Sequence, residues 1–148
     1  MGEDIIDFES NSTKGLIITN KIENNILLFS YPEDFSYISE FEIIELQKNI
    51  REFEKLNTTV LLIGYGNMLS HYAWIEAIKM KTGIEITIPI LEDKLNEIAR
   101  KYGMVYENLI TNKVVIIGKD RKIKVIQDYA QNIPRNIYEI KRIIQMMY

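Results

Sequence analysis

The spacing of apolar residues along the chain alternates between two patterns, one typical of strands and one typical of helices. Short apolar runs bounded by polar residues or glycine predict strands or extended segments at 14–19, 24–30, 60–66, 86–90, 113–118 and 121–127. Apolar residues three or four positions apart predict helices at 39–56, 70–81, 93–102 and 136–147. The chain is therefore expected to alternate strands with helices and to end in a hairpin and a closing helix.

This order predicts an α/β protein in which a mixed central sheet is flanked by helices on both faces. Helices between strands imply crossover connections, whereas the short polar turn between the last two strands predicts an antiparallel hairpin. A hairpin followed by a terminal helix is the closing unit expected of a thioredoxin-like fold. With 148 residues, the chain is expected to form a single domain over 1–148.

Composition and charge indicate which kinds of partner the protein is not expected to bind. Hydrophobic residues make up 47% of the chain and charged residues 26%, as in ordinary globular proteins. The 18 basic and 21 acidic residues leave a net charge of −3, which gives no electrostatic reason to expect nucleic-acid binding. The apolar runs are too short to span a bilayer, and residues 1–10 are acidic and lack an apolar signal core. We therefore expect a cytoplasmic protein with neither nucleic acid nor a membrane as partner.

The sequence contains no cysteine and a single histidine, His71. The lack of cysteine excludes disulfides, thiolate metal sites and thiol nucleophiles together. One histidine also excludes a two-histidine zinc motif. We therefore expect neither a metal nor a cofactor.

Ser39 lies where the strand at 24–30 should lead into the helix at 39–56, a kind of junction where many enzymes place a reactive group. A serine needs a partner base to become a nucleophile, and we expect the only histidine, His71, to be a helix-start or packed residue. Ser39 and Glu42 fit the S-x-x-E capping box, in which the two side chains bond exposed N–H groups of the helix. We therefore interpret Ser39 as a helix cap, which contributes about 1 kcal/mol.

Four other conspicuous residues also have structural interpretations. Trp74 is expected in the core, and Asp93 is expected to cap a helix. Gly64 and Gly66 follow an apolar run and are interpreted as turn formers, since a lone GYG is no phosphate-binding loop.

Five segments carry the remaining sequence signal. They are YPEDFSYIS at 31–39, SHYAWI at 70–75, IPILED at 88–93, YG at 102–103, and PRN at 134–136 followed by Glu139 and Arg142. In this order and spacing they resemble the peroxiredoxins, specifically the AhpC/TSA-like proteins of the typical two-cysteine class, over about residues 4–148. The resemblance implies a thioredoxin-like fold and, where the active site is complete, thiol-dependent reduction of peroxides.

The resemblance also implies that the active site is degenerate. In the family, a cysteine in the motif P-x-x-x-T-x-x-C attacks the peroxide, and an arginine that precedes the last hairpin lowers its pKa. Here Ser39 stands at the position of the cysteine and Asn112 at that of the arginine, while Glu40 and Phe41 replace the following Pro-Thr. The degenerate site positions are Pro32, Ser36, Ser39, Glu42, Asn112 and Arg135. Several parts of the site differ together, which indicates natural decay of an unused site.

Peroxide reduction needs an atom that can accept oxygen and pass through the sulfenic acid state, and a serine oxygen cannot do so. We therefore expect a peroxiredoxin-like protein without catalytic cysteines that acts by association. As in the family, it would form a homodimer through the edge strand near 122–128, or a hetero-oligomer with a related protein or another redox partner. Phe41 is either an interface residue or part of the domain's own core.

Two alternatives remain open. The old pocket lined by Pro32, Ser36 and Ser39, at a helix N-terminus, would bind a small polar ligand or an anion. On family grounds alone the chain would be a thiol-dependent peroxide reductase, but a fold does not carry a function with it.

Overall fold

Four strands form the central sheet of the computed structural model, which describes residues 2–147. They are β3 (Asn25–Tyr31), β4 (Thr58–Gly64), β7 (Asn112–Ile117) and β8 (Ile123–Tyr129), in the spatial order β4-β3-β7-β8. β3 pairs in parallel with β4 and antiparallel with β7, and β7 forms an antiparallel hairpin with β8. The expected mixed sheet and final hairpin are therefore confirmed.

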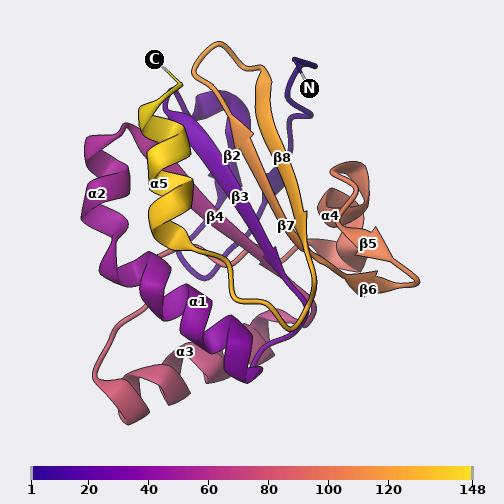
Figure 1. Cartoon of the computed structure of the whole chain (residues 1–148). Helices are drawn as coiled ribbons and strands as arrows, with labels where there is room; N and C mark the ends of the chain where they lie inside the picture. The colour runs from indigo at the N-terminus through magenta and orange to yellow at the C-terminus, as the bar shows by residue number, and fades with distance from the viewer. Residues whose placement is uncertain (1, 148) are drawn as a thin grey trace.

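Helices cover both faces of this sheet (Figure 1). They are α1 (Tyr37–Lys48), α2 (Ile50–Lys55), α3 (Met68–Thr82), α4 (Glu97–Lys101) and α5 (Ile137–Gln145). Leu27 and Phe29 of β3 belong to the core layer formed with α1, α2, α3 and α5, whereas Ile26 and Leu28 belong to the layer formed with α4. A strand buried on both faces needs a continuous apolar run, which explains why β3 lacks the alternation of a half-exposed strand.

The helix expected at 39–56 is two helices, α1 and α2, which meet at Asn49. The Asn49 side chain donates a hydrogen bond to the carbonyl of Glu45 at 2.8 Å and accepts one from Lys141 Nζ at 2.8 Å. Asparagine side chains compete with the backbone for hydrogen bonds, which disfavours them in helix interiors. Because the helical spacing of apolar residues continues across Asn49, the sequence pattern does not reveal that α1 ends there.

Two of the expected strands or extended segments form less strand than the sequence pattern suggests. Only β2 (Ile17–Ile18) forms within 14–19, and it pairs with β1 (Glu9–Ser10). Residues 86–90 form no strand; a single parallel bridge joins Ile90 to Leu62, although Ile86, Ile88 and Ile90 are buried. Pro89 has no N–H group, so it cannot extend the ladder.

The region after residue 92 also departs from the sequence-based expectation. The helix expected at 93–102 is reduced to α4, which is preceded by the 3₁₀ turn η2 (Lys94–Asn96). A small hairpin of β5 (Val105–Tyr106) and β6 (Leu109–Ile110) follows, and apolar periodicity gave no sign of it. Glu107 and Asn108 form its turn with φ angles of 50° and 63°. Two successive positive φ angles are the geometry of a tight hairpin turn, here without the usual glycine.

The N-terminal segment is tied to the sheet layer that carries α4. The Tyr102 hydroxyl donates a hydrogen bond to the carbonyl of Ile6 at 2.8 Å and accepts one from its N–H at 3.0 Å. The Tyr102 ring also meets the Phe8 ring edge-on. Burial raises the pKa of the Tyr102 hydroxyl to about 12. This single side chain therefore holds residues 6–8 against the domain.

Replacing Tyr102 by phenylalanine should lower the free energy of unfolding at pH 7 by about 1–2 kcal/mol, because two backbone groups lose their partner. Folded Tyr102 keeps its proton to about pH 12, whereas the unfolded side chain loses it near pH 10. The Tyr102 contribution to stability is thus present below pH 10 and declines as the pH rises from 10 to about 12. Urea unfolding across this range should show a shallower decline for Y102F than for wild type. The exposed control Tyr106→Phe should behave as wild type.

Candidate functional site

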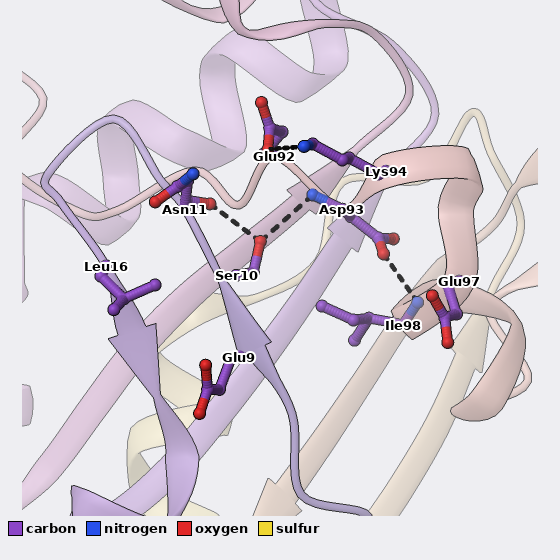
Figure 2. A pocket seen from close by; sticks show the side chains of 9 residues that line it. All are labelled: Glu9, Ser10, Asn11, Leu16, Glu92, Asp93, Lys94, Glu97 and Ile98. Carbon is purple, nitrogen blue, oxygen red and sulfur yellow. Dashed lines mark hydrogen bonds and ion pairs between the residues drawn. The ribbon is translucent and has the colours of Figure 1, made fainter.

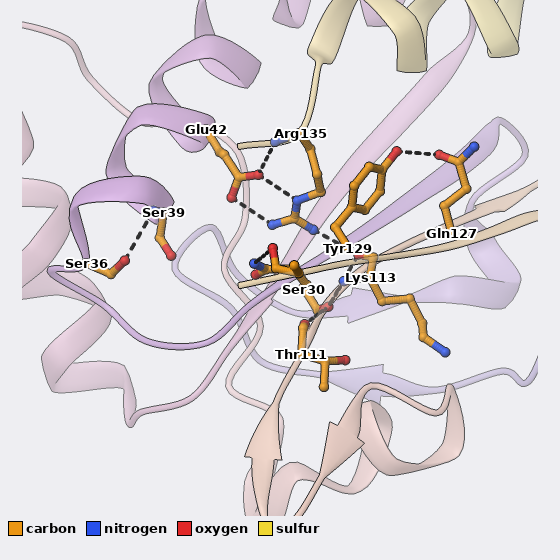
Figure 3. Close-up of polar contacts among 11 residues, drawn as sticks. Ser30, Ser36, Ser39, Glu42, Thr111, Lys113, Gln127, Tyr129 and Arg135 are labelled. Carbon is orange, nitrogen blue, oxygen red and sulfur yellow. Dashed lines mark hydrogen bonds and ion pairs between the residues drawn. The ribbon is translucent and has the colours of Figure 1, made fainter. Parts of the chain in front are cut away.

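The loop after β3 places Ser39 in the first turn of α1, as the sequence indicated (Figure 3). The capping role assigned to Ser39 is wrong, because the helix begins at Tyr37 and its N-cap is Ser36. Ser36 Oγ accepts a hydrogen bond from the N–H of Ser39 at 3.3 Å. Ser39 itself is 1% exposed. Ser39 is therefore a buried residue of the first turn and does not cap the helix.

Glu42 does not complete a capping box either. Its carboxylate accepts hydrogen bonds from Arg135 Nε at 2.7 Å, from Arg135 Nη2 at 2.9 Å and from the Arg135 backbone N–H at 2.7 Å. Both side chains are 0% exposed (Figure 3). The guanidinium also lies 3.5 Å from the centre of the Phe29 ring and donates to the carbonyl of Lys113 at 3.1 Å. Sequence reasoning placed both residues at the site but missed this pairing, because they are far apart in the chain.

The electrostatic environment of Arg135 follows from its burial. Desolvation lowers the pKa of the guanidinium, and the hydrogen bonds and charge of Glu42 oppose that shift. A bidentate pair with further hydrogen bonds is the arrangement in which two buried charges compensate each other. The positive charge of Arg135 is thus already neutralised within the chain and is not free to hold an anion.

Asn112 begins β7 and is 1% exposed. The Ser30 hydroxyl donates to the carbonyl of Thr111 at 2.5 Å and accepts from the N–H of Lys113 at 2.9 Å, which places Asn112 beside the end of β3. Asn112 Nδ2 donates to the carbonyl of Ala130 at 3.5 Å, whereas Oδ1 is buried and has no partner among residues 2–147. Asn112 is therefore a buried, uncharged amide at the start of β7.

The surroundings of the site are closed at Ser39 and open beside it. Pro32 and Ser36 are half-buried. A cavity of about 250 Å³ lies between α1 and the start of α5, and Phe41, Glu45 and residues 134–138 line it. Phe41 is 49% exposed, so the interpretation of Phe41 as a core residue is wrong. Its exposure is what an interface residue requires, and the interface itself stays a prediction.

A second polar cluster, which sequence reasoning did not assemble, centres on Asp34. Its carboxylate accepts hydrogen bonds from the Tyr31 hydroxyl and the Ser70 hydroxyl, each at 2.7 Å, and lies 2.7 Å from His71 Nδ1. Burial and the charge of Asp34 raise the pKa of Tyr31. Serine and histidine both contact the same carboxylate, whereas hydrolysis by a triad requires the serine to face the other histidine nitrogen. The cluster therefore joins the α1 loop to α3, and it confirms that His71 is a packed residue.

Gly64 is not a turn former, contrary to its sequence-based interpretation. It is the last residue of β4, and a Cβ at this position would lie 2.0 Å from Cζ of the Tyr31 ring. That ring is fixed by its hydrogen bond to Asp34 and by contact with the Trp74 ring, whose centre is 5.3 Å away. Gly66, with a φ of 135°, lies in the bend between β4 and α3, as a residue that changes the chain direction should. Trp74 is fully buried, as expected.

Asp93 caps a helix as expected, but from five positions upstream. Its carboxylate accepts hydrogen bonds from the N–H groups of Ile98 at 2.6 Å and Ala99 at 3.1 Å, in the first turn of α4. Burial raises the pKa of this carboxyl group. Asp93 also lines a cavity of about 300 Å³, whose other lining residues include three glutamates and one lysine (Figure 2). The lining residues are Glu9, Ser10, Asn11, Leu16, Glu92, Asp93, Lys94, Glu97 and Ile98.

Two further classes of feature can be assessed over residues 2–147. Within that range, no three histidine, aspartate or glutamate side chains lie together in a way that could hold a metal ion. Within the same range, no helix combines the length and the apolar character needed to cross a membrane.

The sheet order, the helices on both faces and the serine in the first turn of α1 define a thioredoxin-like protein of the peroxiredoxin type. A cysteine-to-serine mutant of peroxiredoxin 6 of Arenicola marina superposes with a TM-score of 0.89 at 30% identity, covering 98% of this chain and 71% of that chain. The reduced 2-Cys peroxiredoxin of Plasmodium vivax gives 0.89 at 25% identity, covering 98% and 94%. The thioredoxin-like fold inferred from sequence is thus confirmed.

The chain belongs to the AhpC/TSA family, whose model matches residues 1–126. A peroxiredoxin of Thermotoga petrophila is 34% identical over 152 residues, covering 99% of this chain and 71% of the relative. A peroxiredoxin of Thermotoga maritima is 38% identical over 124 residues, covering 82% of this chain and only 58% of the relative. These relatives establish ancestry, which confirms the resemblance seen in the sequence.

Replacing Glu42 by alanine should lower the free energy of unfolding by about 3–5 kcal/mol, because Arg135 would keep a buried charge without a partner. In the control variant Glu139→Ala, the exposed pair with Arg142 is lost. This change should cost less than about 1 kcal/mol. Denaturant unfolding of both variants provides the measurement. The double variant Glu42→Leu/Arg135→Met should be more stable than Glu42→Ala, since no charge remains buried; equal stability of the two would contradict this account.

Replacing Gly64 by alanine should destabilise the protein by about 1–3 kcal/mol or more, because the added methyl group overlaps the Tyr31 ring. The same change in a Tyr31→Ala background should cost much less, since the ring is absent. A double-mutant cycle from thermal or urea unfolding measures the difference. Equal costs in the two backgrounds would show that the ring is not what restricts position 64.

Proposed function

We propose that this chain is a peroxiredoxin-like protein without peroxidase activity, which acts through association with a second copy of itself or with another protein. The observation that carries the proposal is a serine, 1% exposed, in the first turn of α1 of a chain that contains no cysteine. A peroxidatic atom must be oxidised and then reduced again, and an alcohol oxygen cannot follow that cycle.

The charges around Ser39 support the same proposal. A low-pKa thiolate needs a nearby positive charge. Asn112 supplies none, and the charge of Arg135 is held by Glu42 at 2.7 Å. Glu40 adds a negative charge to the first turn of α1 and bonds Lys81 of α3 at 2.8 Å. The surroundings therefore lack the electrostatic support for the family's reaction as well as its nucleophile.

Association is supported by the surface around the start of α1. Phe35, Tyr37 and Phe41 are 58%, 83% and 49% exposed, although they are aromatic. Exposed aromatic residues are enriched at protein interfaces. The small-ligand alternative has weaker support, because Ser39 is buried and a ligand could not reach it without movement of the loop.

The test is peroxide consumption by the purified chain with a dithiol reductant. The wild-type protein should match the blank, while a cysteine-containing peroxiredoxin in the same assay should show turnover. Catalytic turnover by the wild-type chain in many cycles would overturn the proposal. Native mass measurement at micromolar concentration tests association separately, and a strictly monomeric chain without co-purifying partners would count against that part.

Substituting Ser39 by cysteine should not restore turnover, because the thiol would be buried and would lack a neighbouring cation. The rate of thiol alkylation as a function of pH reports its pKa. We expect this pKa at or above the ordinary value of about 8.5. The variant Ser39→Cys/Asn112→Arg should have a lower thiol pKa than Ser39→Cys. Peroxide turnover by the single variant comparable to that of the positive control would show that the site is intact apart from one atom.

A further inference from the structure

We propose that an extended peptide segment of a protein partner binds the open part of the outer edge of β4, in antiparallel orientation and with one of its residues directly opposite Val60. This inference rests on the proposed function and names the surface and the chemistry of the partner. Its basis is the buried N–H and C=O of Val60, which bond no group on the outer side of β4 among residues 2–147.

β4 is an outer strand of the central sheet, and its outer edge is paired only in part (Figure 1). The N–H of Leu62 bonds the carbonyl of Pro89 at 3.0 Å, and the carbonyl of Leu62 accepts from the N–H of Leu91 at 2.9 Å. Backbone groups alternate between the two sides of a strand. The groups of Val60 and Thr58, at every second position before Leu62, therefore point to the same outer edge, where no backbone group of residues 2–147 bonds them.

The neighbouring segment of the chain, residues 87–89, lies beside this open edge but cannot pair with it. Continued parallel pairing would require an N–H at Pro89 to bond the carbonyl of Val60, and proline has none. The Gln47 side chain of α1 also binds the segment, since its Oε1 accepts hydrogen bonds from two of its N–H groups at 2.8 and 3.3 Å. The edge is therefore open because its own neighbour cannot complete the ladder.

A groove of about 230 Å³ lies between the open edge and this segment. Thr58 and Val60 line it, yet each is only 3% exposed, so their backbone groups are largely shielded from bulk water. Buried backbone N–H and C=O groups are nearly always paired, because an unpaired one costs about as much free energy as a lost hydrogen bond. The groove thus combines unpaired donors and acceptors with space for the group that would pair with them.

An antiparallel peptide matches these groups better than a parallel one. In an antiparallel pair, one residue exchanges both N–H···O bonds with the residue opposite, so a single peptide residue satisfies Val60. The next such pair falls two residues further along the peptide, opposite Thr58. A parallel partner would need residues on both sides of Val60, including the side toward Leu62, where the edge is already occupied. Strand addition to an open edge is a recurrent mode of peptide recognition.

The lining of the groove defines the side chains that the peptide should carry. Val60 belongs to the core layer that includes α2, and peptide side chains opposite Val60 and Thr58 lie toward that same face. There α2 contributes Ile50 and the exposed Glu54 to the groove. Because α2 leads directly into β4, Glu54 lies toward the Thr58 end. We therefore expect an apolar residue opposite Val60 and a basic residue opposite Thr58.

Amide hydrogen exchange followed by NMR tests the pairing. The probe is the peptide acetyl-Thr-Val-Thr-Lys-Thr-amide, whose valine should lie opposite Val60, added up to millimolar concentration. It should slow exchange at the Val60 amide several-fold and leave the amide of Leu61, which faces β3, unchanged. The same peptide with an N-methylated valine should bind several-fold more weakly, because the bond to the Val60 carbonyl is lost. Unchanged exchange at Val60 with the unmodified peptide would overturn the inference.

Charge reversal tests the placement of the peptide in the groove. Glu54→Lys should bind this peptide several-fold more weakly and should prefer a peptide with glutamate in place of the lysine. The matched control Glu52→Lys changes an exposed residue of the same helix outside the groove and should keep the wild-type preference. The gain of binding to the glutamate peptide excludes a loss of folding as the cause. An unchanged preference in Glu54→Lys would overturn the assigned placement.

The outcomes separate this inference from the proposed function. If native mass measurement shows association but the peptide does not protect Val60, the β4 inference fails and association by another surface stands. Protection of Val60 in a chain that remains monomeric supports the β4 inference and counts against the homodimer. Peroxide turnover would overturn only the non-catalytic proposal.

Discussion

The buried ion pair of Glu42 and Arg135 is the constraint on which the rest of the site depends. It joins α1 to the segment that begins α5, and the guanidinium rests on the Phe29 ring of β3, so three elements meet at one charged contact. Neither charge can be removed alone without leaving the other in a low-dielectric interior. The position of α1, and with it the burial of Ser39, is therefore fixed by an interaction that has no need of catalysis.

The buried pair of Glu42 and Arg135 differs from the neighbouring positions Ser39 and Asn112 in how much of the packing it holds together. Glu42 and Arg135 support the structure as well as the site. Ser39 and Asn112 stand where the resemblance places the reactive cysteine and its arginine, and serine and asparagine fit there as buried residues. The Asp34 cluster fixes the loop before α1 in the same way, through three hydrogen-bonding partners from β3 and α3. The contacts that hold α1 and the loop before it are thus formed by charged and polar groups within the chain, whereas Ser39 and Asn112 are buried and uncharged.

The predictions from sequence that were wrong relied on a local pattern where a contact with a distant residue decided the structure. Ser36 and Ser39 both precede the apolar run of α1, and the capping-box pattern favoured Ser39 as the cap. In the structure, Glu42 cannot complete that box because its carboxylate binds Arg135, more than ninety residues away. Asn49 interrupts a helix whose apolar spacing continues without a break. Gly64 looks like a turn residue in the chain, and only the Tyr31 ring in the folded protein shows why a side chain is excluded there.

The sequence by itself determined the mixed α/β architecture, the order of the main strands and helices, and the absence of a thiol. These follow from apolar periodicity and composition, which are local properties of the chain. The tertiary structure decided which charges neutralise each other, which residue caps α1, that Phe41 is exposed and that part of the β4 edge is open. Those features depend on groups distant in sequence that compete for the same hydrogen bonds and the same space, and no local pattern contains that competition.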